Sequence, residues 1–135
     1  MEGSSIKEFE ILQKEVLAPG IKRFILSAPL IAEKAKVGQF IIVRVDEKGE
    51  RFPLTLVDWN QDKGNITIVV QEVGVSTKKL GRLEVGQHVM DIVGPLGNPA
   101  EIKKYGEAVV VGGGVGVALA YPRIKALKRA GNRVI

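Results

Sequence analysis

The amino-acid sequence predicts an all-β, six-stranded antiparallel Greek-key barrel followed by an incomplete, Rossmann-like α/β unit. Residues 6–95 contain six short stretches rich in β-branched residues, each bounded by turn residues. After Gly106, an apolar stretch, a glycine-rich turn and a stretch of helical period follow one another. We therefore expect residues 1–99 to form the barrel and residues 100–135 to begin the α/β unit.

The strands predicted for the first part are six apolar or alternating runs. They are Lys7–Leu17, Lys22–Ala28, Gln39–Val45, Pro53–Asn60, Asn65–Val73 and His88–Val93. Turns such as Ala18-Pro19-Gly20 and Asp62–Gly64 separate them. Six short strands at this spacing favour a closed or nearly closed barrel over a helical bundle.

One stretch of the first part, Ser76–Leu83, predicts a short helix. Ser76 or Thr77 is the expected N-cap, because either hydroxyl can accept a hydrogen bond from the free N–H groups of the first turn. The same helix end could bind phosphate, since it offers unpaired N–H groups and partial positive charge, and Gly74 lets the backbone come close. An ordinary helix cap without a ligand is the alternative.

The last predicted elements form a β–α–β unit. Glu107–Val111 is expected as an apolar strand, Val117–Ala130 as a helix and Arg133-Val134-Ile135 as the start of a second strand. The helix would place four side chains on one face, namely Val117, Tyr121, Ile124 and Leu127. Pro122 is tolerated if the helix begins near Ala118. A β–α–β unit cut at its second strand cannot form a parallel sheet by itself, so we expect the chain to be part of a longer protein.

The run Gly112-Gly113-Gly114-Val115-Gly116 lies between the first strand and the helix of that unit. A strand, a glycine turn and a helix in this order are typical of a nucleotide-binding crevice. The usual dinucleotide fingerprint is incomplete, because a third glycine or alanine counted from Gly112 would fall at Val117. Four glycines within five residues nevertheless favour close approach of a ligand over a turn alone.

Two further runs carry candidate binding groups. In Arg51-Phe52-Pro53-Leu54-Thr55 the arginine can fork onto a phosphate, the proline stiffens the strand entry and the threonine hydroxyl can donate to a ring nitrogen. A charged loop that leads into an edge strand is the alternative. Gly94-Pro95-Leu96-Gly97 predicts a rigid turn between the two parts of the chain.

The composition excludes several classes of function. The 135 residues include no cysteine, which rules out a disulfide framework, a cysteine nucleophile and a cysteine-ligated iron–sulfur cluster within this chain. The formal net charge of +5 fits anionic ligands or an acidic partner, but the isolated aromatic residues do not indicate nucleic-acid binding. No apolar run approaches the roughly 18–20 residues that span a bilayer, so a cytoplasmic protein is expected.

Taken in order and spacing, these motifs resemble those of the ferredoxin–NADP reductase superfamily, which pairs an FAD-binding antiparallel barrel with a nucleotide-binding α/β domain. The likeness is strongest to the small subunit of NADH-dependent reduced ferredoxin:NADP oxidoreductase, also called sulfide dehydrogenase. The electron-transfer subunit of dihydroorotate dehydrogenase is a near relative of that subunit. The resemblance spans nearly all of this chain but about half of a family member.

The resemblance implies roles for individual residues. Arg51, followed by Pro53, would meet the FAD pyrophosphate, Thr55 would approach N5 of the isoalloxazine ring and Leu54 would pack beside the ring. The other implied cofactor-binding residues are Val69, Val70, Gln71, Gly74, Ser76, Thr77, Gly94, Pro95, Leu96, Gly97, Gly112, Gly113, Gly114 and Gly116. Ser76 stands where the family has glycine, and Leu119 where it usually has proline.

The resemblance also implies a function. A flavoprotein electron-transfer subunit would pass electrons between NAD(P)H, FAD and a [2Fe–2S] cluster to a larger catalytic subunit, with ferredoxin as a second possible partner. Cysteines outside this chain would hold the cluster. No residue is expected to act as a catalytic acid or base, or as a metal ligand. Two alternatives stay open, namely an electron-transfer subunit of dihydroorotate dehydrogenase and a barrel that binds a ligand or protein without redox chemistry.

Overall fold

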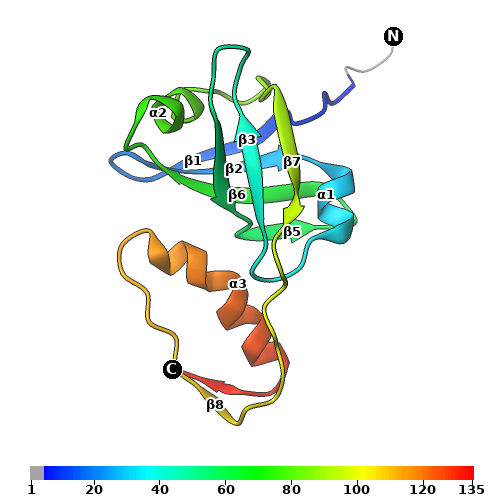
Figure 1. Cartoon of the computed structure of the whole chain (residues 1–135), viewed down its shortest axis with the longest axis vertical. Helices are drawn as coiled ribbons and strands as arrows, with labels where there is room; N and C mark the ends of the chain where they lie inside the picture. Colours follow the sequence, from blue (N-terminus) through cyan, green and yellow to red (C-terminus); the bar gives the residue numbers. More distant parts are fainter. Residues whose placement is uncertain (1–4) are drawn as a thin grey trace.

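The structure, a computed structural model, describes residues 5–135 in two parts, with α3 and β8 lying below the larger β-rich part (Figure 1). The strands are β1 (Ile11–Ala18), β2 (Ile21–Ser27), β3 (Phe40–Arg44), β4 (Arg51–Thr55), β5 (Asp58–Asn60), β6 (Asn65–Gln71), β7 (Asp91–Leu96), β8 (Glu107–Ala108) and β9 (Arg133–Val134). The helices are α1 (Pro29–Lys34), α2 (Val75–Gly81) and α3 (Gly116–Arg129).

The strands of the first part form two antiparallel sheets, with the orders β1-β2-β6-β5 and β4-β3-β7. The chain joins their edges on one side, because it passes from β4 into β5 through Leu56 and Val57. Backbone hydrogen bonds join the other edges, where the Ile11 N–H donates to the Gln87 carbonyl over 2.7 Å. The first part is therefore two antiparallel sheets of four and three strands that meet at their edges, and not the closed six-stranded barrel that the sequence predicts.

Three strand predictions of the first part were wrong in their bounds. The predicted strand Lys7–Leu17 starts too early, since β1 begins at Ile11. The predicted strand Pro53–Asn60 is divided between β4 and β5 because Leu56 and Val57 are both buried, which breaks the alternation of a single strand where the chain turns between sheets. The predicted strand His88–Val93 starts too early. His88 makes only an isolated bridge with Glu10, and β7 begins at Asp91.

Helix α1 was not predicted. It has six residues, starts with Pro29 and buries only Ile31 and Ala32, so its sequence is too short to show a helical period. Helix α2 begins one residue before the predicted start, and its N-cap is Gly74 rather than Ser76 or Thr77. A glycine N-cap leaves the first turn without a side-chain acceptor from the cap position itself.

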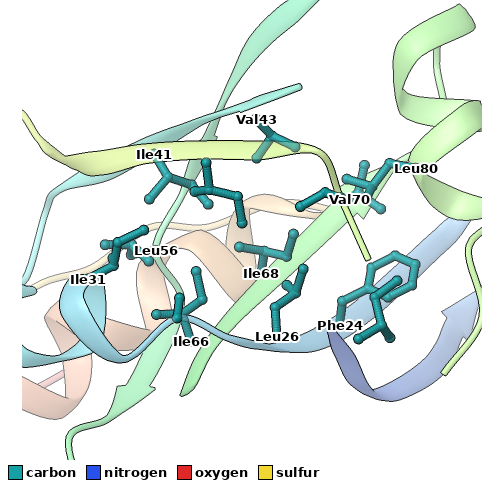
Figure 2. Packing of buried hydrophobic residues seen from close by; sticks show 14 of the residues in the cluster. Phe24, Leu26, Ile31, Ile41, Val43, Leu56, Ile66, Ile68, Val70 and Leu80 are labelled. Carbon is teal, nitrogen blue, oxygen red and sulfur yellow. The ribbon is translucent and has the colours of Figure 1, made fainter. Parts of the chain in front are cut away.

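The core lies between the two sheets and follows the alternation of their strands (Figure 2). Phe24 and Leu26 on β2 face inward, as do Ile66, Ile68 and Val70 on β6, and all five are fully buried. Ile41 and Val43 on β3 cover them from the opposite sheet. Burial of such a side chain stabilises the fold by about 1.5–3 kcal/mol, so this apolar layer is the main support of the first part.

The second part is a small parallel unit. Contrary to our expectation for an interrupted β–α–β unit, β8 and β9 pair in parallel over two residues. The predicted strand Glu107–Val111 is reduced to Glu107–Ala108, and Val109 and Val111 are 67% and 90% exposed. Helix α3 starts at Gly116, so Pro122 lies in its interior and is buried there, while Val117 and Tyr121 of the expected packed face are exposed.

The net positive charge lies in the second part of the chain. All 15 acidic residues and 15 of the 20 basic residues precede Gly116. The net charge of +5 therefore belongs to residues 116–135, which contain five basic residues and no acidic one. Among the described residues, no helix is long and apolar enough to cross a membrane.

The connection between the parts is held by buried polar contacts. The side chain of Gln39 is 9% exposed, and its Nε2 donates to the Gly97 carbonyl over 2.9 Å while its Oε1 accepts the Lys36 N–H. The Ala100 N–H donates to the Val37 carbonyl over 2.7 Å. These bonds fix the segment after β7 against the loop before β3.

The core makes a direct prediction for stability. Replacing Leu26 with alanine should lower the free energy of unfolding by about 2–5 kcal/mol, because the side chain is fully buried and its removal leaves a cavity. Urea denaturation followed by circular dichroism measures this change. The matched variant Val16→Ala, at a position 62% exposed, should stay within about 0.5 kcal/mol of the parent. Equal losses would contradict the assignment of Leu26 to the core.

Candidate functional site

A cavity of about 560 Å³ lies between the outer face of the first sheet and the glycine turn that precedes α3. Its walls come from the β1–β2 hairpin, β2, β6, the β4–β5 junction and the start of α3. The lining residues are Leu17, Ala18, Ile21, Arg23, Ile25, Val57, Asp58, Thr67, Val69, Gly114, Val115, Val117, Ala118 and Tyr121. The two parts of the chain thus meet across a mainly apolar cleft with a few polar groups, as ligand sites commonly do.

The glycine turn presents bare backbone beside this cleft. Gly112 is favoured by tight packing, because a Cβ there would lie 3.2 Å from Cα of Val117, and Gly114 has a φ of +57°. Gly113 and Gly116 have neither a positive φ nor an atom within 4 Å of a Cβ position. The fold itself therefore does not need glycine at Gly113 or Gly116, and their bare backbone leaves room for a molecule outside the chain.

Strand β6 serves the core and the cleft with alternate residues. Thr67 and Val69 point outward and line the cleft, whereas Ile68 and Val70 point into the core. Gln71 ends the strand and is exposed. Of the predicted run Val69-Val70-Gln71, only Val69 reaches the cleft with its side chain.

Strand β4 shows the same division. Phe52 and Leu54 pack against the core, while Arg51 is exposed and Thr55 is half-buried. Nη1 of Arg51 donates to Oδ2 of Asp91 over 2.7 Å, across the intervening strand β3. A guanidinium has five N–H donors, so this contact leaves Arg51 able to bind a second anion. Contact of Leu54 with a flavin stays a prediction.

The start of α2 is organised by Thr77. Its Oγ1 accepts the N–H groups of Val73 and Gly74 over 3.0 and 2.9 Å, and its hydroxyl donates to the Gly74 carbonyl over 3.1 Å. The Thr77 hydroxyl is therefore occupied within the chain. Gly74 has open space at its Cβ position, which leaves the approach to this helix end unobstructed.

The far end of α2 is anchored by a partly buried ion pair. Nζ of Lys22 lies 3.0 Å from Oε1 of Glu72 and donates to the Gly81 carbonyl over 3.0 Å. A Cβ at Gly81 would overlap the Glu72 carboxylate, so a larger residue there would displace that side chain from its present position. The side chain of Leu80 adds a fully buried apolar contact. These contacts hold the end of α2 against β2 and the end of β6.

A second ion pair joins α2 to the hairpin that leads into β4. Nζ of Lys79 lies 3.0 Å from Oδ2 of Asp46. The hydrogen bond from Lys79 lowers the pKa of the Asp46 carboxyl, with further contributions from the charge of Lys79 and the N–H groups of Lys48 and Gly49. The pair holds α2 beside the turn that immediately precedes Arg51.

The remaining predicted residues have clear packing roles. A Cβ at Gly94 would lie 2.8 Å from Cγ2 of Ile41, and one at Gly97 would lie 3.0 Å from the ring of Phe40. Gly97 also has a φ of +86° and accepts the Gln39 amide. Gly94, Pro95 and Leu96 lie in β7, so the predicted turn over these residues was wrong and the strand continues past the predicted end at Val93. The backbone from Gly94 to Gly97 thus packs closely against β3.

The structure brings together only part of the predicted site. Val69 and Gly114 line the cleft, but the side chains of Arg51, Ser76 and Thr77 do not. Sequence reasoning missed most of the cleft wall, including Val57, Thr67 and Tyr121. The alternation of β6 could have identified Thr67 together with Val69, whereas the place of Tyr121 depends on how α3 folds back.

The chemistry of the cleft suits binding and positioning. Within residues 5–135, no three His, Asp or Glu side chains gather as a metal site would require. The cleft contains one carboxylate, Asp58, and it is already paired with Lys125 at 3.3 Å. The arrangement can therefore enclose a planar apolar group and approach it with backbone, without a paired acid and base.

Two packed antiparallel sheets, followed across a cleft by a strand, a glycine turn and a helix, define a ferredoxin reductase-like fold. Residues 8–100 match the family described as the oxidoreductase FAD-binding domain, and the chain belongs to this family. Phthalate dioxygenase reductase shares the fold with a TM-score of 0.76 at 22% identity, over 93% of this chain and 40% of that one. The predicted fold class is therefore confirmed.

Closer relatives are electron-transfer proteins. The chain is 43% identical to a dihydroorotate dehydrogenase B (NAD(+)) electron transfer subunit homolog of Thermotoga maritima, over 99% of this chain and 47% of the relative. It is 35% identical to the corresponding subunit of Shouchella clausii, over 92% of this chain and 50% of that one. A solved structure of the NADH-dependent reduced ferredoxin-NADP oxidoreductase matches with a TM-score of 0.94 and 43% identity, over 99% and 48%. The chain spans about half the length of these relatives.

The Asp46–Lys79 pair predicts a titration. The Asp46 carboxyl should titrate below an ordinary aspartate, and Lys79→Met should raise its pKa because the main hydrogen bond is lost. The folded-state pKa is the lowered one, so the contribution of the pair to stability is present above the unfolded pKa of about 3.9 and is lost as pH falls through the folded value. Carboxyl-detected NMR measures both values. An unchanged pKa in Lys79→Met would contradict the assigned cause.

Proposed function

We propose that this chain is the FAD-binding part of a flavoprotein electron-transfer subunit that exchanges electrons with a nicotinamide nucleotide. The observation that carries this proposal is the cleft of about 560 Å³ between the outer face of β2 and β6 and the bare glycine turn. A flavin and a nicotinamide react through stacked rings, which needs a flat apolar wall on one side and close-approaching backbone on the other. Val69 supports the first requirement and Gly114 the second.

The donor groups of the chain fit the diphosphate of FAD. Arg51 is exposed and keeps free N–H donors beside its contact with Asp91. The backbone N–H groups of Val75, Ser76 and Thr77 lie in the first turn of α2, where a helix has no internal acceptors. The Lys79–Asp46 pair keeps this turn next to the hairpin that carries Arg51. We assign Arg51 and the backbone of Ser76 and Thr77 to the diphosphate.

Thr55 and β6 would orient the flavin. The half-buried Thr55 hydroxyl is available as a donor at the end of β4, and the family resemblance assigns it to the flavin N5. Bound FAD supplies the conversion between two-electron hydride transfer and single-electron transfer. The chain's own residues bind, orient and exclude water, and the proposal requires no acid or base from them.

The remaining elements of the proposal lie outside this chain. The [2Fe–2S] cluster and its cysteines, the rest of the pyridine-nucleotide domain and the larger partner subunit belong to a longer protein and its complex. Support for the longer protein and its partner subunit comes from the relatives, which are named electron transfer subunits and are about twice as long, whereas the [2Fe–2S] cluster stays a prediction. Ferredoxin as a partner and location in the cytoplasm stay predictions.

A second candidate has its own support. The similarity to dihydroorotate dehydrogenase B subunits favours electron transfer to that class of enzyme, with the same cleft and the same cofactor. The two candidates differ in the partner subunit and not in the residues described above. Purification of the longer protein with its partner, followed by identification of that partner, separates them.

Arg51 provides a test of the proposed FAD site. Replacing Arg51 with alanine should weaken FAD binding by about 1–3 kcal/mol, because a charge-assisted hydrogen bond to the diphosphate is lost. Titration of the apoprotein with FAD, followed by quenching of flavin fluorescence, gives the dissociation constant. Asp91→Asn, which releases Arg51 from its ion pair, should bind FAD at least as tightly as the parent.

Lys48→Ala serves as the matched control. It removes an exposed positive charge from the same hairpin without altering Arg51, so its FAD affinity should stay close to that of the parent. Equal affinities of Arg51→Ala and the parent would reject the diphosphate assignment. A folded parent chain that binds no FAD would reject the proposed function and favour a barrel without redox chemistry.

A further inference from the structure

The seam between α3 and the outer face of the first sheet is largely hollow. Besides the main cleft, cavities of about 390 and 270 Å³ lie along it. Asp58 lines all three cavities, and Lys125 lines the two smaller ones. Asp58 therefore stands where the three cavities meet, and Lys125 where the two smaller ones meet.

Asp58 and Lys125 are each held in place by a neighbour in their own secondary-structure element. Oδ1 of Asp58 accepts the N–H of Trp59 over 2.9 Å, which fixes the carboxylate at the start of β5. Nζ of Lys125 lies 3.3 Å from that same oxygen and 5.5 Å from the centre of the Tyr121 ring, one helical turn earlier on α3. The ammonium group is thus placed between a fixed carboxylate and an aromatic face.

Among the described residues, this is the ion pair that joins α3 to the first sheet, through β5. The other ion pairs lie within the first part, or join neighbouring segments of the second. The polar contacts near Gln39 fix the chain only where it leaves β7. Within residues 5–135, the backbone hydrogen bonds at the cleft-side end of α3 stay within the helix and the glycine turn before it.

We propose that Lys125 and Asp58 are positioning residues whose ion pair, backed by Tyr121, sets the distance between α3 and the sheet and so the width of the cleft. When the pair opens, α3 is free to move away from the sheet about the connection near Gly97. The glycine turn and Val69 lie on opposite walls of the cleft and separate with it. The pair acts through α3 and needs no contact with a cofactor.

Any effect of the cleft width on electron transfer rests on the proposed function. The distance between α3 and the sheet does not, and it can be measured directly. Because the chain has no cysteine, two introduced cysteines accept spin labels at those positions alone. Glu33→Cys on α1 and Lys128→Cys on α3 are both exposed and lie on helices of the two parts. Pulsed electron paramagnetic resonance of this doubly labelled chain, without cofactor, reports the distance across the seam.

The expected result is one narrow distance in the parent background. Asp58→Asn loses the partly exposed ion pair, and Lys125→Met loses the pair and the cation–π contact, so both should add a longer distance and raise the ratio of open to closed molecules, about threefold for Asp58→Asn and up to about tenfold for Lys125→Met. Lys125→Arg keeps both interactions and should retain the narrow distance. Glu84→Gln removes the Lys14–Glu84 pair, which lies away from α3, and should also retain it.

The parent chain alone gives a second measurement that needs no substitution in the pair. Raising the ionic strength from about 0.01 M to about 1 M shortens the screening length from about 30 to 3 Å and should increase the open population. A distance that is unchanged both by salt and in the folded Asp58 and Lys125 variants would overturn the inference. If those variants fail to fold, the salt series on the parent decides alone. Failure of the parent to bind FAD would reject the proposed function and leave the distance result standing.

Discussion

The structure depends on one constraint, which is that β2 and β6 must serve two opposite faces with alternate residues. Ile66, Ile68 and Val70 fill the space between the sheets, and their neighbours Thr67 and Val69 form the wall of the cleft. A shift of one residue in the pairing of β6 would exchange the two sets and place a threonine in the core. The register that stabilises the first part is therefore the same register that builds the candidate site.

Ion pairs then add to the apolar core in placing the helices. Lys22 and Glu72 fix the end of α2, Lys79 and Asp46 hold its flank, and Lys125 connects α3 to β5. Such pairs contribute modestly to stability when they are partly exposed, but each of them fixes the direction of an element. Core packing decides that the chain folds, whereas these pairs decide where the helix ends and the glycine turn lie relative to the sheets.

The sequence predicts the architecture better than the site. The alternation of β-branched residues is sufficient for most strands of the first part, and the order of strand, glycine turn and helix is sufficient for the second. The division at Leu56 and Val57 is not visible, because two consecutive apolar residues also fit a single buried strand. The use of the Thr77 hydroxyl within its own turn and the engagement of Arg51 by Asp91 are likewise hidden, since both depend on contacts between side chains and the folded backbone. Local motifs identify which residue types can bind a cofactor, but not which atoms remain free after folding.

The separation of charge between the two parts has a consequence for how the molecule behaves at a distance. Residues 1–115 carry equal numbers of acidic and basic groups, and the whole excess of five positive charges lies on the last twenty residues. The molecule is therefore an electric dipole whose positive pole is the α3 end. In the field of an anionic surface it would rotate until that end leads, before any contact forms. At physiological ionic strength this turning acts only over a range of about 8 Å, so it selects the orientation of an encounter and not its frequency over long distances.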